Sequence, residues 1–211
     1  MAEEIIIVGA GIAGLSCAAA LAEAGRPVRV LEKSRGLGGR CATRRLDDDG
    51  REVRVDHGAQ FFTVRDDRFQ RRVDAWLARG EVRVWTRGLP VWTPAQGVAD
   101  TSSTGHPRYV APEGLRRLGR LLIGHVEVAR QRRVAGLAPD HGGWRVDLDD
   151  GDAVWARAVV VTAPAPQTLA LLPDEGIDPD ARAALGSIDY APSFAWMTAY
   201  DAPAPPWPGL R

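Results

Sequence analysis

The chain has 211 residues, of which 45% are hydrophobic and 26% charged, so it can form one large globular domain or two small ones. Lysine plus arginine and aspartate plus glutamate balance at 27 each. Without a net charge to attract polyanions, we expect neither nucleic acid nor a membrane as a partner. Two cysteines, Cys17 and Cys41, are too few for a disulfide framework or a four-ligand zinc site and fit a reducing, cytoplasmic location.

An uncharged stretch at residues 5–22 is long enough for a signal peptide or a membrane span. However, Glu3 and Glu4 precede it where a signal peptide would carry positive charge, and three glycines interrupt it. We therefore expect this stretch to belong to a folded domain.

The same stretch opens a strand–helix–strand pattern. Residues 4–8 form a β-branched run, residues 12–24 are rich in alanine and leucine and stop before Gly25, and residues 27–32 are β-branched again. Such a unit requires a parallel crossover, so the sequence predicts an α/β fold of Rossmann type with a parallel sheet.

Later segments continue the mixed pattern. Residues 34–40 are expected to be irregular, and residues 46–52 form a polar stretch. Pro164 and Pro166 are expected to end the strand run that begins at residue 158. The remaining predicted elements are a helix at 66–79, a strand pair across 82–92, a polar loop at 100–107, a helix at 115–123, strands at 125–130 and 158–162, and a hairpin of 144–148 with 153–156.

A glycine motif follows the first predicted strand, with Gly9, Gly11 and Gly14 in the spacing G-x-G-x-x-G. The first glycine permits a tight turn, the second lets backbone N–H groups approach a pyrophosphate, and the third lets helix pack on strand. Glu32 ends the next strand, where a carboxylate can bind both ribose hydroxyls and would repel a 2′-phosphate. The motif predicts a dinucleotide site, disfavours NADP, and leaves FAD and NAD open.

Two further motifs bear on that choice. Residues 33–40 read Lys-Ser-Arg-Gly-Leu-Gly-Gly-Arg, and residues 56–60 read Asp-His-Gly-Ala-Gln. The second glycine turn lets backbone lie close to a long flat ligand, and Arg40 can place positive charge near a pyrophosphate. The later motif offers small residues against which a planar ring can stack.

Together with the glycine motif, these segments resemble the amine-oxidase-like flavoproteins, most closely the renalase branch. Residues 109–114 and 159–166 support the resemblance, which runs in order from residue 5 to about residue 202. It implies an FAD-binding domain at 1–65 and 108–172, with a parallel sheet and a β-hairpin. Residues 66–107 and 173–211 would form an incomplete α+β substrate domain.

The resemblance also implies which residues line the FAD site, with Val134 near the adenine. These are Gly9, Gly11, Ala13, Gly14, Glu32, Lys33, Gly39, Arg40, Ala59, Gln60 and Val134. For His57, a hydrogen-bonded structural histidine is favoured over a proton-transfer role. No catalytic residue is nominated, and the other histidines lack the spacing of metal ligands.

Renalase-like enzymes oxidise dihydro-NAD(P) isomers by hydride transfer to flavin, with oxygen as the final acceptor. The resemblance implies this reaction on a small-molecule substrate. Alternatives are a flavin amine oxidase acting on another substrate, a non-catalytic nucleotide-binding remnant, and a plain NAD-dependent dehydrogenase.

The family pattern continues into a final Gly-Asp segment that closes the flavin site, and nothing after residue 162 resembles it. We therefore expect the chain to be a fragment that binds FAD weakly or not at all.

Overall fold

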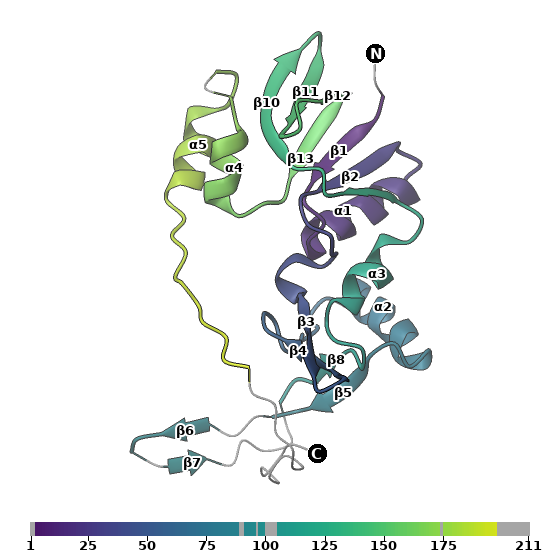
Figure 1. Cartoon of the computed structure of the whole chain (residues 1–211), viewed down its shortest axis with the longest axis vertical. Helices are drawn as coiled ribbons and strands as arrows, with labels where there is room; N and C mark the ends of the chain where they lie inside the picture. The colour runs from purple at the N-terminus through teal and green to yellow at the C-terminus, as the bar shows by residue number, and fades with distance from the viewer. Residues whose placement is uncertain (1–2, 89–90, 96, 100–104, 174, 198–211) are drawn as a thin grey trace. The chain divides into compact units, whose positions relative to one another are not determined.

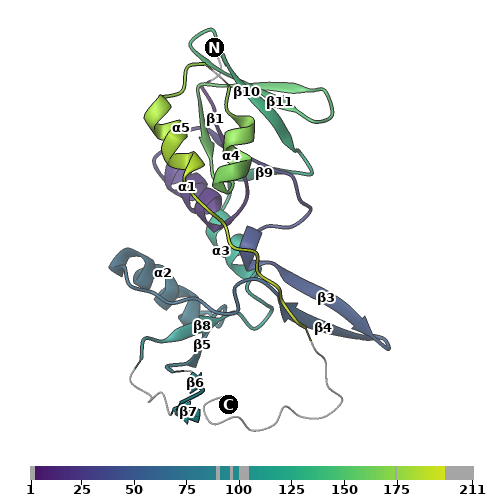
Figure 2. The same cartoon turned by 90° about the vertical axis from the view of Figure 1, so that its left-hand side faces the viewer.

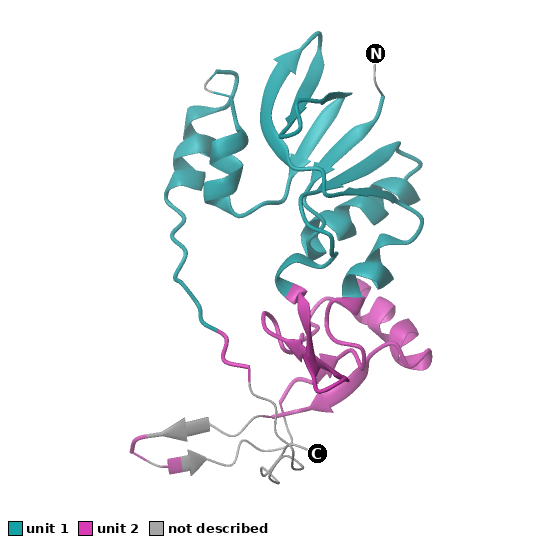
Figure 3. Cartoon of the chain, in the orientation of Figure 1, with its two compact units in different colours: residues 1–40, 118–194 teal, residues 41–117, 195–211 magenta. Residues whose placement is uncertain are grey.

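The computed structural model describes residues 3–88, 91–95, 97–99, 105–173 and 175–197. The chain divides into two compact units, shown in Figure 3. Unit 1 comprises residues 1–40 and 118–194, and unit 2 comprises residues 41–117 and 195–211. The two units are defined by which residues contact each other, not by what they bind. The division into an FAD-binding domain and a substrate domain therefore stays a prediction.

Unit 1 is built on a four-stranded parallel sheet with strand order β13-β1-β2-β9 (Figure 1). All four segments that the sequence predicted as buried parallel strands are found in it, which confirms the α/β fold. The strands are β1 (Ile5–Val8), β2 (Val28–Glu32), β9 (Glu127–Arg130) and β13 (Ala158–Val161).

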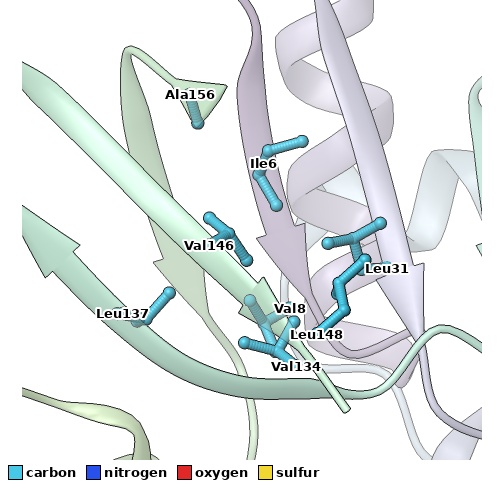
Figure 4. Packing of buried hydrophobic residues seen from close by; sticks show 8 residues of the cluster. All are labelled: Ile6, Val8, Leu31, Val134, Leu137, Val146, Leu148 and Ala156. Carbon is cyan, nitrogen blue, oxygen red and sulfur yellow. The ribbon is translucent and has the colours of Figure 1, made fainter. Parts of the chain in front are cut away.

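Helix α1 (Ile12–Glu23) packs against β1 and β2. A three-stranded antiparallel sheet also packs on the parallel sheet, and its apolar side chains meet Ile6, Val8 and Leu31 in one core (Figure 4). Ile7, between Ile6 and Val8, is fully buried too. A sheet covered on both faces has continuous apolar strands, which explains the β-branched runs. The covering strands are β10 (Val134–Asp140), β11 (Gly143–Leu148) and β12 (Ala153–Ala156).

Unit 1 also contains most of helix α3 (Arg117–Ile123) and two further short helices, α4 (Ala165–Leu171) and α5 (Pro179–Gly186). Helices α4 and α5 pack against each other (Figure 2). The strand predicted at 158–162 ends at Val161, before Pro164 and Pro166, as expected. Both prolines lie at the beginning of α4, where a missing N–H costs nothing and a fixed φ favours the helix. Strand β10 and helices α4 and α5 were not predicted.

Unit 2 begins with a hairpin of β3 (Thr43–Asp48) and β4 (Arg51–Asp56). Residues 46–52 stand out in the sequence only as a polar stretch, and no strands were predicted there. Asp49 and Gly50 both have positive φ, the conformation of a tight hairpin turn. The strands escaped prediction because they are polar and mostly exposed, without apolar alternation.

The predicted amphipathic helix is confirmed as α2 (Asp67–Ala78), with Val73 and Trp76 buried. Its N-cap is Asp66, whose carboxylate accepts hydrogen bonds from the N–H groups of Arg68 and Phe69. The Arg68 guanidinium and these backbone donors lower the pKa of Asp66 to about 2.

The strand pair predicted across 82–92 is wrong in its pairing. Strand β5 (Arg83–Thr86) pairs with β8 (Arg108–Val110), and β6 (Val91–Thr93) pairs with β7 (Gly97–Ala99). Alternation of apolar and polar residues predicts strands but does not determine which strands pair with each other. Helix α3 (Arg117–Ile123) begins two residues later than predicted, and most of the loop predicted at 100–107 lies outside the described residues.

Candidate dinucleotide-binding site

The glycine motif lies at the turn from β1 into α1, as predicted. Gly9 has φ +104°, a conformation that disfavours side chains. A Cβ on Gly14 would lie 2.0 Å from the carbonyl oxygen of Gly9 and 2.8 Å from Oγ1 of Thr162. The first and third glycines are therefore required by the fold itself.

No contact among the described residues requires a glycine at position 11. A Cβ there would have none of these residues within 4 Å, and its φ of −73° is open to any residue. Gly11 is the N-cap of α1 without a side-chain cap, so backbone N–H groups at the helix start remain available, and Ala13 in the first turn is exposed. Open backbone at a helix N-terminus is suited to phosphate groups.

Glu32 is buried, with 8% of its surface exposed, and its carboxylate points at the glycine turn. Its Oε2 accepts a 2.7 Å hydrogen bond from the N–H of Ala10, and its Oε1 accepts one of 2.7 Å from the N–H of Ser34. A carboxylate has about four acceptor positions, so it can still accept from two ribose hydroxyls. Glu32 thus fixes the turn as well as facing the ligand position.

The second glycine turn lies directly against the first. The N–H of Gly38 donates to the carbonyl of Ala10 at 2.8 Å. Gly39 has φ +54°, and a Cβ there would lie 3.1 Å from the Cα of Gly11. Arg40 follows in the short 3₁₀ turn η1 (Gly39–Cys41); it is exposed and has no ion pair among the described residues. The structure therefore unites two motifs that are separated along the chain.

An open groove of about 540 Å³ lies beyond Glu32, where β2 and β9 end. It is lined by Lys33, Ser34, Arg35, Gln131, Arg133 and Asp149. The Nζ of Lys33 donates to Gln167 at 3.1 Å. Val134 follows the groove residue Arg133, but its side chain is buried in the core of unit 1. Only the backbone of Val134 can therefore face a ligand.

Thr162 is a site residue that sequence reasoning did not identify. Its hydroxyl donates toward the carbonyls of Val8 and Gly9 at 3.0 and 3.2 Å, and its N–H donates to Val8 at 3.0 Å. These contacts fasten the end of β13 to the glycine turn. No spacing rule connects residue 162 with residue 9, so only the fold reveals them.

The remaining predicted residues belong to unit 2, and their place at the cofactor stays a prediction. Ala59 is half-buried, while Gln60 and His57 are exposed. No hydrogen bond of the His57 ring is found within the described part of the chain, so its role stays a prediction. Across the same residues, no group of three or more His, Cys, Asp or Glu is placed to hold a metal ion, and no helix is long and apolar enough to cross a bilayer.

These features fit FAD. The open space at Gly11 and the available N–H groups of α1 match the pyrophosphate of a dinucleotide, and the Glu32 carboxylate matches its ribose. Residues 7–76 match the family model of an NAD(P)-binding Rossmann-like domain.

Individual relatives match over short stretches. An L-amino acid oxidase of Lachesis muta is 54% identical over 48 residues, 23% of this chain and 9% of the relative. A carotenoid 3,4-desaturase of Haloarcula japonica is 45% identical over 64 residues, 30% of this chain and 12% of the relative. A hydroxysqualene dehydroxylase of Sinorhizobium fredii is 43% identical over 58 residues, which cover 28% of this chain and 13% of the relative. The matches span about a tenth of these relatives.

The second family model covers more of the chain. Residues 90–210, more than half of the 211, match the model for flavin containing amine oxidoreductases. That match and the Rossmann-like match identify FAD as the cofactor. The chain therefore belongs to the flavin containing amine oxidoreductase family.

Proposed function

We propose that the chain is part of a renalase-like FAD-dependent oxidoreductase. Its reaction is oxidation of dihydro-NAD(P) isomers by hydride transfer to the flavin, with oxygen as the final acceptor. The renalase-like motifs at residues 33–40 and 56–60 support this choice within the family. The proposal places the enzyme in the cytoplasm, in keeping with the cysteine content.

One observation carries the cofactor part of the proposal. Glu32, buried at the end of β2, bonds the N–H of Ala10 and thereby lies at the glycine turn with acceptor positions to spare. Gly11 leaves space beside that carboxylate. A ribose at Glu32 and a pyrophosphate over Gly11 would occupy this turn without displacing any side chain.

In this arrangement the residues of unit 1 hold and orient the cofactor. Glu32 accepts from the ribose hydroxyls, the N–H groups of the first turn of α1 face the pyrophosphate, and Arg40 adds positive charge. Lys33 and the backbone of Val134 would flank the adenosine. When bound, FAD would provide the group that accepts the hydride and that oxygen then reoxidises.

Ala59 and Gln60 of unit 2 would lie beside the flavin ring. The segments 66–107 and 173–211 would bind substrate, and residues 173–194 of the second segment belong to unit 1. Positioning of the substrate against the flavin would provide the rate acceleration, because hydride transfer needs close and aligned reactants more than side-chain chemistry.

A second candidate is a flavin amine oxidase with another substrate, and the similarity to an L-amino acid oxidase favours it. A remnant that binds nucleotide without catalysis, and an NAD-dependent dehydrogenase, are the other outcomes to be distinguished.

The test begins with FAD titration of the purified chain, followed by absorbance and fluorescence. Bound flavin is then mixed anaerobically with dihydro-NAD(P) isomers or with amines and amino acids. Bleaching by the dihydronicotinamides alone supports the proposal, and bleaching by amines alone supports the second candidate. A chain that remains colourless with FAD excludes the flavin function for this chain, and binding of NAD instead would indicate a dehydrogenase.

A further inference from the structure

Two sequence motifs of unit 2, separated by about 50 residues, are joined in the structure. The Asp56–Gln60 segment leaves β4, and residues 109–116 lead from β8 to α3. Asp56 accepts hydrogen bonds from the N–H of Leu115, at 2.9 Å to Oδ1 and 3.1 Å to Oδ2. These bonds connect the beginning of one motif to the end of the other.

Thr43 completes this connection from the first residue of β3. Its hydroxyl donates to Oδ1 of Asp56 at 2.5 Å and accepts from the N–H of Arg116 at 3.1 Å. Gly114, with φ +92°, leaves the room that Thr43 needs, since a Cβ on Gly114 would lie 2.4 Å from the threonine Oγ1. We call Asp56, Thr43 and the N–H groups of Leu115 and Arg116 the Asp56 latch.

A second attachment lies six residues after Asp56. Phe62 and Tyr109 exchange backbone hydrogen bonds of 3.0 and 2.8 Å, and their rings stack with centroids 5.3 Å apart. Tyr109 is buried, with 5% of its surface exposed. The chain between Asp56 and Phe62 is thus held at both ends by the same 109–116 segment.

The chain between these attachments depends on them for its position. Residues 57–61 make no backbone hydrogen bond within the described part of the chain. His57, Gly58 and Gln60 are exposed, and Ala59 is half-buried. Phe61 is half-buried, and its ring centroid lies 6.0 Å from that of Trp85 and 5.3 Å from the guanidinium carbon of Arg108, so it reinforces the attachment at Phe62. Residues 57–60 have no such contact among the described residues and take their conformation from the two ends of the segment.

We propose that Asp56 is a positioning residue that holds residues 57–61 in place to receive the flavin ring. This inference rests on the proposed function, which places Ala59 and Gln60 beside the flavin. Asp56 acts through the latch and does not itself contact the cofactor. Loss of its carboxylate would release one end of the segment while leaving the Phe62 attachment intact.

The test compares Asp56→Ala with two other variants. Asp56→Asn keeps the size of the side chain and one acceptor oxygen. Val73→Ala truncates a fully buried residue of α2 in the same unit that takes no part in the latch, so it reports general weakening of unit 2. Each protein is measured without ligand and with FAD.

Without ligand, the readouts are backbone order parameters of residues 57–61 and hydrogen exchange of the Leu115 and Arg116 amides. In Asp56→Ala we expect order parameters to fall from roughly 0.85 to below about 0.6 and exchange to accelerate about tenfold or more. Asp56→Asn should lie between Asp56→Ala and the unchanged protein. Val73→Ala should lower thermal stability without this localised change.

With FAD, Asp56→Ala should bind about tenfold more weakly and alter the shape of the bound flavin absorbance bands, which report the ring environment. Unchanged order parameters, or the same changes in Val73→Ala as in Asp56→Ala, would overturn the inference. Unaltered affinity and spectrum in Asp56→Ala, in a chain that otherwise binds FAD, would overturn it too and leave the proposed function standing. If the unsubstituted chain binds no FAD, the proposed function fails and the positioning role fails with it, whereas the ligand-free readouts still decide whether the latch exists.

Discussion

The hydroxyl of Thr162 lies within hydrogen-bonding distance of the Gly9 carbonyl, 3.2 Å away, although the two residues come from opposite ends of unit 1. We expect Thr162→Val, which keeps the shape and removes the hydroxyl, to lower the free energy of unfolding by about 1 kcal/mol. FAD binding should weaken several-fold because the glycine turn loses a support. Thr162→Ser should behave as the unsubstituted protein in urea unfolding and FAD titration. A loss in Thr162→Ser with none in Thr162→Val would show that the methyl group, and not the hydroxyl, matters.

Gly11 and Gly14 offer a matched pair of substitutions. Gly11→Ala adds a methyl group in open space at an ordinary φ, so the ligand-free protein should unfold within about 0.5 kcal/mol of its normal stability. The same methyl group would occupy the proposed pyrophosphate position, so FAD affinity should fall at least about tenfold. Gly14→Ala instead collides with the Gly9 carbonyl and should cost about 3 kcal/mol of stability. Urea unfolding and FAD titration separate the two effects; normal FAD affinity in Gly11→Ala would refute the placement of the pyrophosphate.

Glu32→Gln tests the double role of the carboxylate. A glutamine has one acceptor oxygen, so one of the N–H groups of Ala10 and Ser34 would face an NH₂ group. We expect a loss of about 1–3 kcal/mol in unfolding free energy, measured without ligand. FAD titration should show a further loss, because the ribose hydroxyls lose acceptors. A stable variant with full FAD affinity would exclude Glu32 from the ribose site.

The N-cap of α2 should make stability depend on acid pH. The folded-state pKa of Asp66, about 2, lies below its ordinary value of 3.8, mainly because the Arg68 side chain donates a hydrogen bond to the carboxylate. The charged form is therefore stabilised by folding, so the contribution of its charge is present above about pH 4, decreases as the pH falls below 3.8 and is lost as the pH falls through about 2. Thermal unfolding should show Asp66→Ala less stable than the unsubstituted protein at pH 6, with the difference shrinking as the pH falls through about 2. A difference that persists at low pH would mean that the carboxylate charge is not responsible. Asp180→Ala, in the first turn of another helix, serves as a control.

The sequence was sufficient to predict the local part of the site. Gly9, Gly11, Gly14 and Glu32 follow rules of turn geometry and spacing that operate over a few residues, and the structure places them together. The parallel strands were also predictable, because a sheet buried on both faces requires continuous apolar runs.

What could not be predicted are contacts between distant segments. Thr162 is an ordinary strand-end residue in sequence, and Asp56 gives no sign that it meets the N–H of Leu115. The hairpin of β3 and β4 is a different case. Its Asp49-Gly50 turn is a recognised hairpin signal, but the polar strands around it carry no apolar periodicity. Local turn chemistry outweighed periodicity there.

The pairing of β1 with β13 has a consequence for how the molecule is made. Ile5 pairs with Ala158, so this pairing cannot form until more than 150 residues of the nascent chain have been synthesised. Residues 41–117, by contrast, are contiguous and can fold while the ribosome is still extending the chain. Late closure of non-local pairs slows folding. The pairing of β1 with β2 and its packing against α1 are local, but its other edge and the face covered by β10–β12 stay uncovered meanwhile. Vectorial synthesis thus makes the first strand to emerge one of the last to be completed.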